Sequence, residues 1–532
     1  MKRKVLAMML VMGMLGGLLS GCGAQGGQDA AATDIEAQEG DTSAAAQTAD
    51  GVKTLDLYID FSWYTGDTWE GIIPEEITKA TGVAFNVTRS VDDSQLGLMI
   101  ASGELPDVIF TTDENMDRLC DSKMSYSYNE LIEQYGLDWQ PDEERIGIAR
   151  THNVDPEDEN YYTIVQNYNT AKEWENYEGG IPGIGGVYYR RDIWKELGSP
   201  EMNTKEQVMA VMKQVREQYP EMQVLNAGNA VWRLRGVSTW FGITNDFQYA
   251  ADGSVALQDT LPEFYDFAKF VNEMYRDGYF PEENLALTNE DDALQQAVSG
   301  KCFMYEWNVR PTQMDQMNTQ LHEVDPDAEW AFLPILDDAP EITKANSGWA
   351  GMFISRNCKD PEAAIRIIEY LNSKEGQHLS LWGREGVDYT LDDRGIPQFS
   401  EEWKAANQDS TVMVKTYNTN FFCTTEIDEL SQYYSGRTEQ EMEEHTKNAD
   451  KIVSYPELDL ALPQASSEMG IIFTKIKEAR DAERMKLYTA PTAEDFEAAY
   501  QEYMALLDKM GVQDLNAYVT ESASRLKEEF GF

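Results

Sequence analysis

The start of the folded body alternates between strand-like and helix-like patterns. Apolar and polar residues alternate over 55–60 with the period of a half-buried strand. A helix over 74–82 begins with proline and two glutamates and ends at a glycine, and 83–88 has the pattern of a second strand. A helix over 93–101 and a wholly apolar strand at 108–110 follow. This β-α-β-α-β order predicts a mostly parallel sheet flanked by helices.

Three later segments have strong helical spacing. They cover 260–278, 360–371 and 492–510, and the chain after about residue 448 is predicted to be largely helical. The folded body, about 52–532, is too long for one compact core. We therefore expect an α/β protein with two domains.

The first residues have the pattern of an export signal. A positive stretch at 2–4 precedes an uncharged apolar run over 5–19, which is too short to span a bilayer comfortably. The Leu-Ser-Gly-Cys sequence that follows resembles the bacterial lipobox. This resemblance implies that 1–21 is a lipoprotein signal peptide and that Cys22 is lipidated. Residues 22–51 are small or polar, so we expect a disordered tether there.

Charge excludes one class of partner. The chain carries 94 acidic and 43 basic residues, which gives a formal net charge of −51. A surface this acidic repels polyanions. We therefore expect no nucleic-acid binding.

The cysteines and histidines form no motif of a metal site. Four cysteines besides Cys22 are scattered without a CxxC pair, and four histidines form no HExxH motif. We expect no metal and no cofactor. The spacing leaves open whether the four cysteines pair or stay as free, buried thiols. They are Cys120, Cys302, Cys358 and Cys423.

Six segments between residues 101 and 389 resemble one family. The segments are ASGELPDVI at 101–109, YYRRD at 188–192, YRDGYFPE at 275–282, GKCFM at 300–304, GWAG at 348–351 with DPEAA at 360–364, and GREGVDY at 383–389. They are similar to segments of extracellular solute-binding proteins of bacterial ABC importers, in particular the long sugar-binding lipoproteins of Gram-positive bacteria. The helices over 492–526 are also similar to the end of the family's chains.

The resemblance implies a two-lobed, periplasmic-binding-protein-like fold with added C-terminal helices. Each lobe is expected to be a mostly parallel sheet flanked by helices and to be discontinuous in sequence. We expect lobe 1 to comprise 52–165 and 350–400, and lobe 2 to comprise 166–349 and 401–532. The ligand would lie between the lobes, which close by hinge motion. One family feature is missing: the calcium loop has no counterpart in 218–226, where alternate oxygen ligands are absent.

Sugar rings have apolar faces and hydroxyl rims, so a sugar site needs aromatic platforms beside a few polar groups. In an open α/β sheet, the carboxyl ends of the strands face the ligand crevice. In lobe 1 we predict ligand contacts from Trp63, Tyr64, Trp69, Asp107, Thr111, Thr112 and Asp113. Bracing of its own turn is the alternative role for Asp107.

Further contacts are predicted around the second lobe and the loops. Glu306 and Trp307 follow a predicted strand, and Trp349 lies between glycines at a predicted lobe crossing. Arg384 and Glu385 lie in the 383–389 loop, where Glu385 could instead serve the loop's own hydrogen bonds. No basic residues cluster around these segments, which argues against a highly anionic ligand.

The resemblance implies the substrate-binding lipoprotein of an ABC importer, which captures a carbohydrate, an oligosaccharide above all. Its partners would be the transporter permease subunits, and it would be a monomer anchored by lipid to the outer face of the cell membrane. The alternatives are the same fold with a non-sugar solute such as a peptide, or a ligand sensor for a membrane kinase. Since no nucleophile elbow, P-loop or dinucleotide fingerprint is present, we expect no enzyme.

Overall fold

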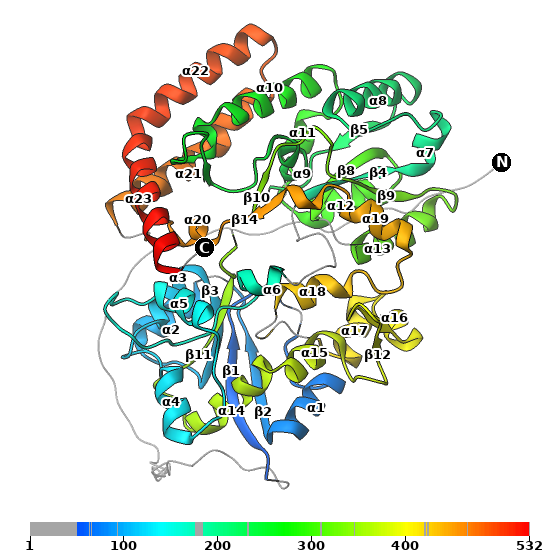
Figure 1. Ribbon diagram of the computed structural model, residues 1–532. Helices are drawn as coiled ribbons and strands as arrows, with labels where there is room; N and C mark the ends of the chain where they lie inside the picture. The colour runs from blue at the N-terminus through cyan, green and yellow to red at the C-terminus, as the bar shows by residue number, and fades with distance from the viewer. Residues whose placement is uncertain are drawn as a thin grey trace, which may run out of the picture. The chain divides into compact units, whose positions relative to one another are not determined.

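Two four-stranded sheets carry the fold in the computed structural model (Figure 1). The structure describes residues 51–530, apart from 63, 65, 93, 176–184, 231–232, 309–310, 345, 420–421, 423–424 and 465–466. The predicted signal peptide, Cys22 and the tether therefore lie outside the described residues.

The first sheet has the predicted β-α-β-α-β arrangement. Its strands are β1 (Lys53–Ile59), β2 (Val83–Arg89), β3 (Val108–Thr112) and β11 (Ala350–Ile354), in the order β11-β3-β1-β2. Strand β1 runs parallel to β2 and β3, whereas β11 is antiparallel to β3. The connecting helices are α1 (Ile72–Thr81) and α2 (Gln95–Ser102). A strand from far along the chain thus completes the sheet.

Local sequence signals set the ends of the predicted helices. Helix α1 ends at Gly82, whose φ of 71° is left-handed, a conformation that glycine adopts without strain. Helix α14 (Pro361–Asn372) begins at Asp360, whose side chain accepts the N–H of Ala363 at 3.0 Å. Helices α10 (Pro262–Arg276) and α22 (Ala493–Met510) also lie where their spacing predicts them.

The first lobe is built around one apolar core. Leu57, Val108 and Ile365 belong to it, and so do Trp403 and Phe422. The segment just beyond residue 400, which we predicted to belong to lobe 2, thus packs with the first sheet. Further elements of this lobe are α3 (Asp113–Leu119), α4 (Tyr128–Tyr135), α5 (Glu143–Thr151), α15 (Lys374–Trp382), β12 (Tyr389–Leu391), β13 (Pro397–Phe399), α16 (Glu401–Ala406) and α17 (Ser410–Thr416).

The second sheet is mixed, whereas we expected it to be mostly parallel. Its strands are β4 (Gly185–Arg190), β5 (Gln223–Asn226), β8 (Cys302–Asn308) and β9 (Trp330–Leu333), in the order β5-β8-β4-β9. Strand β4 is antiparallel to both β8 and β9, and β5 is parallel to β8. The sheet is mixed because β4 lies between β8 and β9 and runs opposite to both of its neighbours.

Helices cover the second sheet and extend its core. The C-terminal helices α21 (Glu468–Tyr488), α22 and α23 (Val512–Phe530) share one apolar core with β4 and β5. The other elements of this part are α7 (Arg191–Glu196), α8 (Lys205–Gln218), α9 (Arg235–Ser238), β6 (Phe247–Tyr249), β7 (Val255–Leu257), α11 (Glu282–Leu285), α12 (Glu290–Val298), α13 (Pro311–Val324) and α20 (Pro456–Leu460).

Paired backbone segments connect the two lobes. The N–H of Gln166 donates to the carbonyl of Ala350 at 2.8 Å, and the N–H of Trp349 donates to the carbonyl of Gln166 at 3.1 Å. Gly348 has φ 95°, and a Cβ there would lie 2.2 Å from Cγ1 of Val165. The approach of these two segments therefore requires a glycine.

A third connection follows α17. After α18 (Glu426–Gln432) and α19 (Glu439–Thr446), strand β14 (Ile452–Ser454) pairs in parallel with β10 (Ile342–Lys344). The short helix α6 (Ala171–Glu175) lies on the first connection. The chain thus passes from the first core towards the second lobe after α17, and we call this passage the third crossing.

Candidate functional site

Polar groups meet where β1 and β3 of the first sheet end. Asp60 follows β1, and its carboxylate accepts hydrogen bonds from Thr111 Oγ1 at 2.7 Å and Asn115 Nδ2 at 3.1 Å. Thr112 ends β3 and donates its hydroxyl to the carbonyl of Trp349. The carboxyl edge of the sheet thus joins three chain segments through side-chain hydrogen bonds.

Aromatic rings cover the same edge and form what we call the aromatic shelf. The ring centroids of Phe61 and Trp349 are 5.0 Å apart, and those of Phe110 and Phe422 are 5.2 Å apart. Trp69 stacks on Phe422 at 6.3 Å with an interplanar angle of 19°. The shelf consists of Phe61, Tyr64, Trp69, Phe110, Trp349 and Phe422. Its rings come from the loop after β1, from β3, from the lobe crossing and from the loop after α17.

The structure brings several predicted contact residues to this edge. Trp69 and Trp349 are half-buried there, while Tyr64 is buried, and desolvation raises the pKa of its hydroxyl well above the usual range. Thr111 and Thr112 lie at the end of β3 beside them. Trp63 lies outside the described residues. Asp113 opens α3, and only its backbone is described.

Asp107 lies at the amino end of β3, away from the shelf. Its carboxylate accepts the N–H groups of Asp56 and Lys359, each at 2.9 Å. The side chain is 4% exposed. Asp107 therefore braces its own turn against β1 and the start of α14, which is the alternative role that the sequence allowed.

Glu306 is fully buried on strand β8 of the second sheet. Its carboxylate accepts backbone N–H groups from Leu234, Gly236 at 3.2 Å and Val237 at 3.3 Å. Burial raises the pKa of this carboxyl well above its usual range, against the opposing effect of these N–H donors and of Arg233. The geometry makes Glu306 an anchor for the turn that starts α9.

Trp307 and the 383–389 loop are not part of the aromatic shelf. Trp307 is 6% exposed and packs against Tyr305, with 5.5 Å between ring centroids, in a small core with α13. Arg384 pairs with both carboxylate oxygens of Asp388, at 2.8 and 3.1 Å. Arg384 and Glu385 line an open groove of about 860 Å³ together with residues of α1 and α15. The groove includes no ring of the shelf.

A pocket that the sequence did not predict lies between α13 of the second lobe and α16–α18. Its volume is about 450 Å³. We call it the amide pocket, because carboxamides form much of its wall, and one of them, Gln316, donates to the carbonyl of Asn407 at 3.3 Å. The rest of the wall consists of aromatic, apolar and hydroxyl side chains and of three charged ones, Asp315, Lys404 and Arg437. The whole wall consists of Gln313, Asp315, Gln316, Leu381, Phe399, Trp403, Lys404, Asn407, Gln408, Met413, Thr419, Gln432, Tyr433, Ser435 and Arg437.

One ion pair lies in the amide pocket. Arg437 pairs with Asp315, and burial raises the pKa of this carboxyl, partly offset by the arginine. The Oε1 atom of Gln313 is buried without a hydrogen-bond partner in the described part of the chain. The pocket therefore offers neutral donors and acceptors beside flat apolar rings, which suits a hydroxyl-rich ring.

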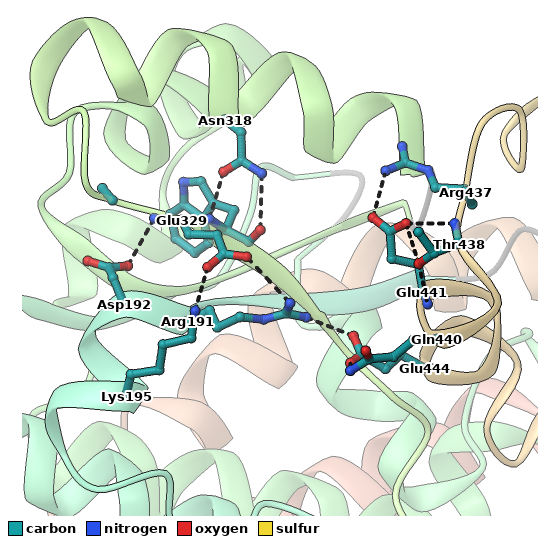
Figure 2. A network of polar contacts seen from close by, with 12 residues as sticks. Arg191, Asp192, Lys195, Asn318, Glu329, Arg437, Thr438, Gln440, Glu441 and Glu444 are labelled. Carbon is teal, nitrogen blue, oxygen red and sulfur yellow. Dashed lines mark hydrogen bonds and ion pairs between the residues drawn. The ribbon is translucent and has the colours of Figure 1, made fainter.

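A polar network fixes α19 to the second lobe beside this pocket (Figure 2). Arg191 lies between Glu329, at 3.4 Å, and Glu444 of α19, at 2.8 Å. Lys195 pairs with Glu329 at 3.0 Å. Arg437 precedes α19 and reaches Asp315 of α13. The segment that carries part of the pocket wall is thus held by charged side chains of α7 and α13, together with Glu329 just before β9.

The remaining cysteines and acids form no metal site where the chain is described. Cys120, Cys302 and Cys358 are buried and unpaired, while Cys423 lies outside the described residues. Within the described ranges, no group of three or more His, Cys, Asp or Glu side chains could hold a metal ion. None of the helices in the described ranges has the length and apolarity of a membrane span.

A family model described as "Bacterial extracellular solute-binding protein" matches residues 73–383. The match covers more than half of the chain, including both sheets except β1. No curated protein matches the chain.

Several solved structures share the fold over nearly the whole chain. The ABC-transporter substrate-binding protein FusA of Streptococcus pneumoniae, in complex with kestose, has 15% identity, a TM-score of 0.65 and covers 90% of this chain and 100% of its own. The N-glycan transport solute-binding protein NgtS of the same species has 17% identity, a TM-score of 0.56 and coverages of 90% and 98%. A solute-binding protein of Bifidobacterium longum infantis described as binding HMO has 12% identity, a TM-score of 0.61 and coverages of 89% and 99%. The TM-scores and coverages establish a common two-lobed fold, and at identities this low the likeness is one of fold alone.

Proposed function

Because this chain belongs to the bacterial extracellular solute-binding protein family, we propose that it captures an oligosaccharide between its lobes and delivers it to an ABC importer. Members of this family bind solutes outside the cytoplasm. The proposed cycle is capture followed by closure of the lobes about the paired crossing segments. Closure needs contacts that the closed form makes better than the open form.

The amide pocket is the observation that carries the carbohydrate proposal. It joins carboxamides of α13 to aromatic and apolar side chains of α16–α18, so groups from two lobes face one volume. Neutral donors and acceptors suit sugar hydroxyls, and rings suit the C–H faces. The structural neighbours named above include proteins described with kestose, N-glycan and HMO ligands, which supports the same class of ligand.

The aromatic shelf extends the proposed site along the first lobe. Trp69 and Trp349 are half-buried and lie at the carboxyl ends of parallel strands, where ligands bind in open α/β sheets. A site with several aromatic surfaces suits a chain of sugar rings. Trp63, Asp113 and Trp307 stay in the proposal as predicted contacts.

We further propose that Cys22 carries the lipid anchor and that a monomer works at the outer face of the membrane. The lipobox-like sequence supports the anchor, since acyl chains contribute about 0.8 kcal/mol per buried CH₂. The permease subunits of the importer are the proposed protein partner.

A carbohydrate panel tests the ligand class. Thermal unfolding is measured with fructans, high-mannose N-glycans and milk oligosaccharides, and with peptides as the competing class. A ligand at 100 times its Kd stabilises by about 2.7 kcal/mol. A shift with a carbohydrate supports the proposal, whereas shifts with peptides alone would reject it.

Matched variants then locate the site by calorimetry with the carbohydrate that binds. Trp349→Ala should weaken binding about tenfold or more, since one good contact contributes about 1.4 kcal/mol. Trp139→Ala is its control, because Trp139 is a half-buried indole of the same lobe that packs on Tyr128, which is not part of the shelf.

The amide pocket has its own pair of variants. Gln316→Ala should weaken binding by roughly three- to tenfold, the effect of one neutral hydrogen bond. Gln320→Ala, one helical turn further on α13 and exposed, should bind like the parent. Equal affinities for all four variants and the parent would show that the ligand binds neither at the aromatic shelf nor in the amide pocket.

A further inference from the structure

A second cavity, of about 490 Å³, lies within the second lobe between α9, α20 and α21. Four arginines line it, Arg233, Arg235, Arg480 and Arg484, against three aspartates. In a chain with more than twice as many acidic as basic residues, such a balance is exceptional. We call this cavity the arginine pocket. The fold brings together arginines from two distant segments, which no local pattern in the sequence reveals.

Two of these arginines already have acidic partners. Arg484 donates from Nε and Nη2 to the two carboxylate oxygens of Asp259, each at 2.7 Å. Asp259 is fully buried and also accepts the hydroxyl of Tyr503 at 2.7 Å. Arg480 pairs with Asp246. These pairs fix α21 to the body of the lobe, so their guanidinium groups hold the wall in place.

Arg233 differs from them. Its Nε is buried and has no hydrogen-bond partner in the described part of the chain, and its guanidinium forms no ion pair with a described residue. A buried donor without a partner has lost its hydration and gained no hydrogen bond in return, and this cost is larger when the donor is charged. An anion in the pocket would remove this cost. The planar guanidinium group of arginine can donate two parallel N–H bonds, which suits a carboxylate.

The backbone that carries Arg233 is held in place. The following residue, Leu234, has φ 59°, and its N–H donates to the buried carboxylate of Glu306. Gly236 and Val237 donate to the same carboxylate. A Cβ at Gly236 would lie 2.3 Å from the carbonyl oxygen of Gly186, so the turn packs directly on β4. Arg233 therefore lies on a preorganised support, which lowers the cost of binding.

The rest of the wall suits a sugar ring. Asn245 and Gln258 bring carboxamides, and Phe267 and Tyr488 bring aromatic rings. We propose, building on the carbohydrate function above, that the natural ligand is an acidic oligosaccharide and that Arg233 binds the carboxylate of one of its uronic acid residues. Glu306 is then a positioning residue for this site. The carboxylate of one uronic acid residue carries one negative charge, which matches the single positive charge of Arg233.

The test compares uronates with neutral sugars of identical linkage. Oligomers of galacturonate, mannuronate and glucuronate are titrated calorimetrically into the full-length protein, each beside its carboxyl-reduced form, in which CH₂OH replaces the carboxylate. At least one uronate should bind about tenfold or more tightly than its reduced form, and the difference should shrink as NaCl is raised. If no uronate binds better than its reduced form, the inference fails. A neutral oligosaccharide that still binds leaves the proposed function intact, whereas absence of binding by any carbohydrate rejects both.

Variants tie the preference to Arg233. Arg233→Ala should lose the tenfold preference and keep the affinity for the reduced sugar. Arg233→Lys keeps the positive charge but lacks the planar guanidinium group, so it should retain part of the preference. This variant also tests the inference if the alanine variant does not fold. Arg525→Ala, an exposed arginine of α23, should behave like the parent. An undiminished preference in both Arg233 variants would place the carboxylate elsewhere, and equal stabilisation by sulfate, phosphate and uronates would make the pocket a general anion site and overturn the sugar assignment.

Discussion

At the scale of single residues, burial decides which carboxylates serve the fold. Glu306 and Asp107 were predicted to contact ligand, because each lies beside a strand end in the sequence. In the structure both are bound by backbone N–H groups from segments far along the chain. The sequence shows which residue types end a strand. It could not show these amides, since only the tertiary fold brings them to the carboxylates.

The aromatic residues show the same limit. Tyr64, Trp69 and Trp349 were predicted and do share the carboxyl edge of the first sheet, because a general rule places strand ends there. Phe422 and the carboxamides of the amide pocket were missed. They lie on α13 and around α16–α18, whose packing depends on the late position of the third crossing.

His445 of α19 gives a residue-scale prediction on pH. It is 4% exposed, and burial, with Arg437 as a further cause, lowers the pKa of its imidazole to about 4. A lowered folded-state pKa means that the unfolded chain takes up the proton first, so stability falls as pH drops from about 6.5 towards 4. The free energy of unfolding should lose about 2 kcal/mol between pH 7 and pH 5 from this group.

The variant His445→Phe removes this titration and keeps a ring against Phe332, whose centroid is 5.5 Å away. Urea unfolding of both proteins at pH 7 and pH 5 measures the effect, and carboxylates common to both cancel in the difference. Parallel losses of stability in the two proteins would contradict the pKa assigned to His445.

At the scale of elements, signals within the element were sufficient. Helices α1, α14 and α22 begin and end near the proline, cap and glycine positions that the sequence displays. The strand directions of the second sheet were not predictable in this way. They follow from pairs such as Tyr188 with Tyr305, and no local periodicity encodes the direction of a distant partner.

Helix α19 gives a prediction at this scale. Arg191 links Glu329 and Glu444, whereas Lys195 pairs with Glu329 alone (Figure 2). Arg191→Met should loosen α19 and speed hydrogen exchange over Glu439–Thr446 by up to about fivefold, because partly exposed pairs contribute about 0.2–1 kcal/mol. Lys195→Met should leave exchange in α19 unchanged. The same exchange in both variants would show that Glu444 does not hold the helix.

At the scale of the whole molecule, charge predicts a response to salt. With a formal net charge of −51, self-repulsion opposes the compact state. Raising NaCl from about 10 mM to about 150 mM shortens the Debye length from about 30 Å to about 8 Å, so the unfolding midpoint should rise by about 2 °C. Calcium chloride at equal ionic strength should give the same shift. A distinctly larger shift with calcium would reveal a specific metal site and contradict our expectation of none.

The position of β11 constrains the order in which the lobes can form. Its pairing with β3 aligns Ala350 with Thr112, and the first core also needs Trp403 and Phe422. A chain that emerges from its N-terminus first therefore leaves one edge of β3 unpaired until residue 350 has emerged, and such an edge can pair with another chain. The second lobe waits even longer, because Tyr503 and Leu515 belong to its core. A truncated or stalled chain would thus hold two unfinished cores, so we expect successful folding to be a late event that follows release of almost the entire polypeptide.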